Sequence, residues 1–160
     1  MEPSHPAIQS ALASDVELAE WVETPADYIL RPARIDTGLS AYSLWFVIPT
    51  DVPVPISVYV ARNDQGETLL TTGRPQAVWA VLAADPSPPE GEALAVLVHE
   101  LLRDQTRAQQ VVPGSTTVDA EPMAWSLAFD VQDRDAGRTR WSVRLDSIGS
   151  AVATQASPEN

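Results

Sequence analysis

The sequence predicts an α+β fold with an internal duplication, in which each copy is a helix followed by a meander of antiparallel strands and the helices pack on one face of the sheets. The main observation is that the sequence resembles itself when it is shifted by 83 residues. The shift aligns 36–48 with 119–131, and five of the thirteen aligned positions are identical, whereas about one identity is expected by chance. Each copy also begins with helical apolar spacing and continues with strand-like alternation. The alternative is a chance match helped by shared amphipathic patterning.

The two copies divide the chain near its middle. The first spans 1–84 and includes a linker, and the second spans 85–160, so that together they form one structural domain. The linker, 76–84, fits a short helix and a strand equally well. From about residue 155 the tail is expected to fray.

A helix is predicted at the start of each copy. In the second copy Ser87 is the expected N-cap, Pro88 the first helical residue and Glu90 the partner in a capping box. The apolar face that follows consists of Ala93, Leu94, Leu97, Val98, Leu101 and Leu102. In the first copy Ser4 is the equivalent cap. Its thinner stripe consists of Ile8, Ala11, Leu12, Val16, Ala19 and Val22.

Strands are predicted after each helix. The clearest is 41–48, where apolar residues alternate onto one face, and 124–131 repeats the pattern. The other predicted strands are 28–36, 56–61 and 68–72 in the first copy and 140–145 in the second, which follows a turn at 135–137. Pro32 indicates an edge strand or a bulge. The ungapped offset makes Val60 the counterpart of Val143.

The composition excludes several classes of function. The chain has ten arginines, no lysine and 22 acidic residues, for a net charge of −12. This charge argues against binding to nucleic acid or to an anionic membrane surface. There is no cysteine, and the longest apolar run, 77–84, is far too short to span a bilayer. With no visible signal peptide, the expected location is cytoplasmic.

Residues suited to catalysis or metal binding are few. His5 and His99 have no partner at the spacing of a zinc motif, so each is interpreted as structural or solvent-facing. Asp130, Asp133 and Asp135 cluster at a turn without the spacing of an EF-hand, which indicates solubilising residues. We therefore expect no metal and no cofactor.

Asp36 and Asp119 occupy equivalent positions in the two copies, before the long strands. An aspartate there can cap backbone N–H groups, and we prefer this interpretation to paired catalytic carboxylates. No sequence motif for a nucleophile or a phosphate-binding loop is present. The chain is therefore not expected to be an enzyme.

The long strand of the first copy is apolar on its second face as well, through Trp45 and Val47. Such a strand is usually covered on both sides. The cover is either another segment of the same chain, for example the linker around Trp79, or another protein molecule, in which case the patch serves dimerisation or partner binding. Trp45, Val47 and Trp79 are therefore the candidate interface residues, and we expect a homodimer.

Over 6–146, the order helix, strand meander, second helix and further hairpin resembles the type III secretion chaperone-like fold, including the YbjN-like family. The resemblance is one of element order. It implies a small acidic protein without catalytic residues that dimerises and binds a protein client. The vicinal-oxygen-chelate fold also pairs helix-and-strand units, but it usually places histidine and glutamate ligands on strands, and this sequence has no histidine in a predicted strand.

The expected function is that of a cytoplasmic, non-enzymatic protein that binds another protein in a chaperone-like or adaptor manner. The alternative is a small-molecule-binding protein or an enzyme with a pocket between the two copies. In that case Asp36 or Asp119 is expected to surround the ligand.

Overall fold

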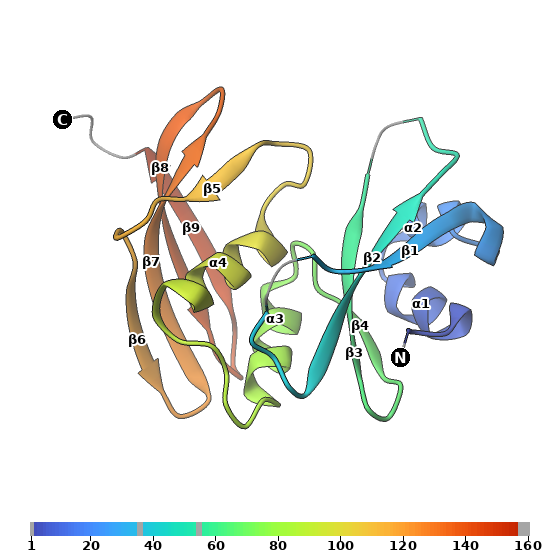
Figure 1. The fold of residues 1–160 in the computed structure, drawn as a ribbon, viewed down its shortest axis with the longest axis horizontal. Helices are drawn as coiled ribbons and strands as arrows, with labels where there is room; N and C mark the ends of the chain where they lie inside the picture. The colour runs from blue at the N-terminus through green and yellow to red at the C-terminus, as the bar shows by residue number, and fades with distance from the viewer. Residues whose placement is uncertain (1, 35–36, 54–55, 157–160) are drawn as a thin grey trace.

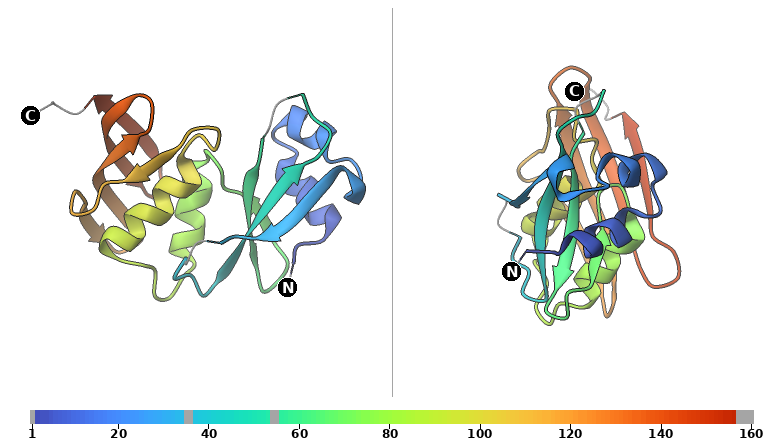
Figure 2. Two further views of the ribbon diagram at one scale, coloured as in Figure 1. Left: turned by 45° about the horizontal axis from the view of Figure 1, so that its top comes forward. Right: turned by 90° about the vertical axis from the view of Figure 1, so that its right-hand side faces the viewer.

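The computed structural model describes residues 2–34, 37–53 and 56–156, and the fold is α+β, as predicted. Four layers follow one another: a helical layer, a four-stranded sheet, a second helical layer and a five-stranded sheet (Figures 1 and 2). No helix in the described ranges has the length and apolarity needed to cross a membrane.

The first half of the chain forms the outer helical layer and the four-stranded N-sheet. Its helices are α1 (His5–Leu12), α2 (Val16–Trp21) and a 3-10 turn at Pro25–Asp27. Its strands are β1 (Tyr28–Pro32), β2 (Tyr42–Pro49), β3 (Val58–Asn63) and β4 (Thr68–Leu70), antiparallel in this order. The predicted single helix is broken because Asp15 accepts a hydrogen bond from Leu18 N–H and caps α2. Val16, expected on the apolar face, is 68% exposed.

The second half forms the central helices and the five-stranded C-sheet. Its helices are α3 (Pro75–Ala83), which settles the linker as helical, and α4 (Gly91–Leu102). Its strands are β5 (Gln109–Val111), β6 (Thr117–Glu121), β7 (Ala124–Asp133), β8 (Gly137–Leu145) and β9 (Ala151–Ala156). The start of the second helix was predicted too early, because Glu90 rather than Ser87 is the N-cap residue. Gln155 and Ala156, where the predicted fraying begins, belong to β9, and 157–160 lie outside the described residues.

In both sheets neighbouring strands follow one another in chain order. The N-sheet has the order β1-β2-β3-β4, and the C-sheet has the order β5-β7-β8-β9, with β6 also paired to β7. Tyr59 on β3 lies opposite Phe46, and Trp141 on β8 lies opposite Phe129. The ungapped offset is therefore wrong by one residue on the returning strand, because Ala61, not Val60, is the counterpart of Val143. The duplication itself stays a prediction.

The N-sheet is covered on both faces by helices of its own chain. Val47, Val58, Val60 and Leu70 pack against α1 and α2. Leu44, Tyr59 and Ala61 on the opposite face pack against α3 and α4, which also cover one face of the C-sheet. The prediction that helices lie on one face of each sheet is therefore right for the C-sheet and wrong for the N-sheet.

Candidate functional site: an apolar groove beside Met123

The predicted interface residues do not form one surface. Val47 is fully buried beneath α1 and α2, and Trp45 is half-buried against the same cluster. The cover is the N-terminal helical layer, not the linker around Trp79, because Trp79 packs in the cluster on the other side of the N-sheet. Val47 is therefore a core residue and cannot contact a partner.

The two histidines have structural roles. His99 is 3% exposed on α4, with its ring centroid 4.8 Å from that of Trp141 in an edge-on arrangement. Burial lowers the pKa of His99 to about 4, so it stays neutral near pH 7. His5 hydrogen-bonds to the Tyr28 hydroxyl and the Glu23 carbonyl, which fastens α1 to the start of β1.

The predicted aspartate cluster stabilises the β7–β8 hairpin. Asp130 pairs with Arg138 and Arg140. Asp133 is buried and accepts hydrogen bonds from the Gln109 side chain and from two turn amides, which lower its pKa to about 2. Within 2–34, 37–53 and 56–156, no group of three or more histidine or acidic side chains is arranged to hold a metal ion.

The prediction for the two equivalent aspartates, Asp36 and Asp119, is a role in capping backbone N–H groups. Asp119 lies on β6 opposite Ser126, within a strand rather than at the start of a loop, so the predicted capping role is wrong for it. Asp36 lies outside the described residues. Asp119 does line a hollow of about 550 Å³, but all of the described residues that line it belong to the C-sheet, so it is not the pocket between the two copies that the alternative function requires.

A groove of about 580 Å³ lies between the α3–α4 connection and the β6–β7 hairpin. It is named the Met123 groove after the residue at its rim. Its apolar lining comes from the end of α3, the connection, α4 and the hairpin: Leu82, Ala83, Pro88, Pro89, Leu94, Val118, Ala120, Pro122, Met123 and Trp125. This volume is in the range of small-ligand and side-chain binding pockets.

Met123 is held in an unfavourable backbone conformation. Glu121 and Ala124 are the last pair of the β6–β7 ladder, so Pro122 and Met123 form the two-residue turn. The φ of Met123 is 62°, the only positive value at a non-glycine residue among those described. A turn with proline first and a positive φ second normally takes glycine or asparagine at the second position. Methionine there costs about 1–2 kcal/mol and leaves its side chain 53% exposed.

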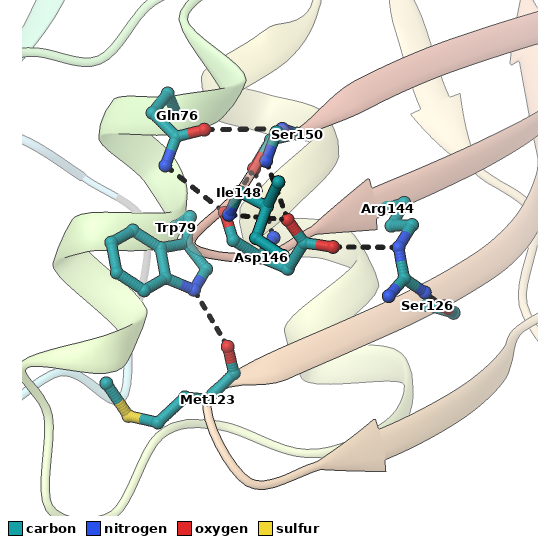
Figure 3. A network of polar contacts seen from close by, with 9 residues as sticks. Gln76, Trp79, Met123, Ser126, Arg144, Asp146, Ile148 and Ser150 are labelled. Carbon is teal, nitrogen blue, oxygen red and sulfur yellow. Dashed lines mark hydrogen bonds and ion pairs between the residues drawn. The ribbon is translucent and has the colours of Figure 1, made fainter.

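The turn is fixed in place by Trp79. The indole N–H of Trp79, on α3, donates to the Met123 carbonyl at 2.9 Å (Figure 3). The Trp79 side chain is partly buried against the apolar core that α3 and α4 form between the two sheets. Of the three predicted interface residues, Trp79 is the one beside the groove, and its polar atom is already used to position the hairpin.

The opposite wall is fixed by Asp85. Its carboxylate, 7% exposed, accepts hydrogen bonds from the backbone N–H of Ser40, Ala41 and Ser87 and from the Ser40 hydroxyl. Burial opposes ionisation of Asp85, but these donors hold its pKa below the ordinary value. Both walls are therefore held by specific hydrogen bonds, and the groove is formed before any ligand binds.

The charged lining residues of the groove are all acidic. They are Asp85, Glu90 and Glu121, and no arginine is among the described residues that line it. An apolar floor with a carboxylate rim suits an occupant that combines apolar and basic side chains.

A second hollow, of about 810 Å³, lies between the two halves, where the ends of β2 and β3 face the segment after α4. Its charged lining residues are Arg103 and Asp104. Asp104 accepts hydrogen bonds from the Thr106 N–H and hydroxyl, and Arg103 donates to both carboxylate oxygens of Glu100. The buried Tyr59 hydroxyl donates to the same carboxylate at 3.0 Å, and burial raises the pKa of Tyr59. This network joins the N-sheet to α4, so its polar groups are used for structure.

Sequence reasoning missed Met123 and Asp85. Pro122 directly before the long strand was a turn signal. The positive φ at Met123 could not be predicted from the spacing of apolar residues, because that spacing carries no information on the backbone conformation of a turn. The repeat places Asp85 at the start of the second copy, and the long-range contact of Asp85 with Ser40 leaves no local pattern in the sequence.

The comparisons with known proteins leave the chain without an assigned family. No protein-family model matches it, and neither the curated proteins nor the solved structures contain a match. The resemblance to the type III secretion chaperone-like and YbjN-like proteins therefore stays a prediction.

Proposed function

We propose that this chain is a non-enzymatic, cytoplasmic protein-binding protein that acts in a chaperone-like or adaptor manner through the Met123 groove. The observation that carries the proposal is Met123 itself, an exposed apolar side chain kept at a backbone position that favours glycine. Strained residues persist where the surrounding structure holds them, and they cluster at functional sites.

Methionine suits such a surface for a physical reason. Its side chain is unbranched and polarisable, so it adapts to differently shaped apolar partners. Trp79 and Asp85 hold the two walls, so adaptation is confined to the rim residue while the groove keeps its shape. This combination supports recognition of a peptide segment by an apolar anchor.

The acidic rim indicates the chemistry of the partner. We propose a segment in which leucine-like side chains enter the groove and neighbouring lysine or arginine side chains lie near Glu90 and Glu121. The attraction between rim and segment decreases as salt increases, because the rim charges are exposed.

A peptide titration tests this function. The probe is a short peptide of leucine and lysine residues, measured by tryptophan fluorescence, with two matched peptides that carry serine for leucine or glutamate for lysine. We expect binding of the first peptide only. Met123→Gly is expected to weaken it about tenfold, because the apolar contact made by the side chain is lost.

Val16→Ala is the matched control, because Val16 is also an exposed apolar side chain but lies on α2 at the far side of the N-sheet. It is expected to leave binding unchanged. Equal affinity for the three peptides, or no effect of Met123→Gly, contradicts the proposed function.

A further inference from the structure

The exposed edges of the two sheets differ in how they are protected against pairing. An edge strand presents free N–H and C=O groups, and natural proteins usually shorten it, charge it or add proline. In the N-sheet, β4 has three residues, and β1 carries Arg31 and Pro32. On one side of the C-sheet, β5 has three residues, and β6 carries Asp119 and Glu121.

The strand β9 has none of these protections. It has six residues, no charge and no proline, and all six residues are exposed. It pairs with β8 over the register from Thr139–Ala156 to Arg144–Ala151, and no strand among the described residues pairs with its other side. Among the described edge strands, β9 is the longest and the only one without a charged residue, a proline or a three-residue length.

The start of β9 is also rigidly anchored. Asp146 accepts hydrogen bonds from the backbone N–H of Ile148 and Gly149 in the β8–β9 loop. The Gln76 side chain, on α3, binds the Asp146 carbonyl and the Ser150 N–H (Figure 3). The loop is therefore fixed to the core, and the edge strand is held in an extended form before pairing. Such preorganisation lowers the entropic cost of association.

The charge around β9 favours a second copy of this chain over a strongly charged partner. The chain carries −12, so two copies repel one another over most of their surfaces. Beside β9, however, the arginines of β8 are already paired, Arg138 and Arg140 with Asp130 and Arg144 with Asp146. The three arginines are thus opposed by two aspartates, so the charge beside the edge is small and does not add to the repulsion between two acidic chains.

We propose that two copies of this chain associate through antiparallel pairing of their β9 strands across a twofold axis, which joins the two five-stranded sheets into one. A twofold axis brings the same surface of both chains together, and antiparallel strands satisfy that symmetry. This interface replaces the dimer expected from Trp45 and Val47, whose basis is lost because Val47 is buried. It is separate from the Met123 groove and does not depend on it.

Sedimentation equilibrium of the 160-residue chain over a wide concentration range tests the proposal. We expect a reversible monomer–dimer equilibrium, with the β9 amides protected from hydrogen exchange more strongly at high concentration. Ala153→Lys places like charges at the shared edge and is expected to raise the dimer Kd at least about fivefold. Thr117→Lys on β6 is the matched control, because it adds the same exposed charge at the opposite edge, and it is expected to leave the Kd unchanged.

Mixing Ala153→Lys with Ala153→Glu provides a second, independent readout. Opposite charges across the axis are expected to restore association that either variant alone lacks. A monomer at the highest concentration overturns the proposal. A dimer whose Kd is insensitive to Ala153→Lys, or whose concentration-dependent protection lies outside β9, also overturns it.

Discussion

Replacing Met123 by alanine and by glycine separates backbone strain from side-chain contacts. Both variants lose the same thioether contacts, but alanine keeps the penalty of about 1–2 kcal/mol that a Cβ incurs at a φ of 62°. Glycine removes this penalty and adds about 0.5–1 kcal/mol of backbone entropy to the unfolded chain. We therefore expect Met123→Gly to unfold with a free energy about 1 kcal/mol higher than Met123→Ala.

The sign of this difference is diagnostic. At an ordinary exposed helical position glycine is about 1 kcal/mol less stable than alanine, and Ala93→Gly on α4 is the matched control for it. Urea unfolding followed by tryptophan fluorescence measures all the variants, with the m-value checked for constancy. If Met123→Ala is as stable as Met123→Gly or more stable, the turn is not strained, and the main argument for a functional Met123 is lost.

Three further predictions concern buried groups. Below pH 6.5 the unfolded chain binds a proton at His99 that the folded chain, with a His99 pKa of about 4, does not, so the free energy of unfolding falls by up to about 3 kcal/mol between pH 6.5 and pH 4. His99→Phe is expected to abolish this fall. Urea unfolding across the pH range measures it, and a variant with the same pH profile as the parent chain contradicts the prediction. Val47→Asp is expected to lower the free energy of unfolding by at least about 3 kcal/mol because it places a carboxylate in a dry core, whereas Trp45→Asp is expected to leave the chain folded. Circular dichroism compares the two variants. A Val47→Asp chain that stays folded but no longer binds a partner contradicts the burial of Val47. Asp85→Ala is expected to cost about 2 kcal/mol because backbone donors of Ser40 and Ala41 lose their acceptor, and thermal unfolding tests this, with no change as the contrary result.

The parts of the fold that were predictable are those with a strong local pattern. The alternation of Leu127 and Phe129 identified β7, and the helical spacing of Leu94 and Leu101 identified the buried face of α4. In contrast, β5 and β6 are short and largely polar, so they lack the alternation that marks a half-buried strand. The strand β9 was missed in the second copy for the same reason, because all of its side chains are exposed.

The candidate site was less predictable because it depends on tertiary contacts. The two-sided apolar pattern at Trp45 and Val47 correctly indicates cover on both faces, but a pattern within one strand carries no information on which segment supplies the cover. The groove depends on Asp85 contacting Ser40 and on Trp79 contacting Met123, which are 45 and 44 residues apart. Of the predicted residues, only Trp79 lies beside the groove.

The most direct test of the account is the NMR signal of the Met123 methyl group. The chain has two methionines, Met1 and Met123, so a sample labelled with carbon-13 at the methionine methyl group gives one internal signal. Addition of the leucine–lysine peptide is predicted to shift the Met123 signal in a saturable manner, and the serine-substituted peptide is predicted to leave it unchanged. A Met123 signal that does not move while the leucine–lysine peptide binds elsewhere contradicts the assignment of this groove as the functional site.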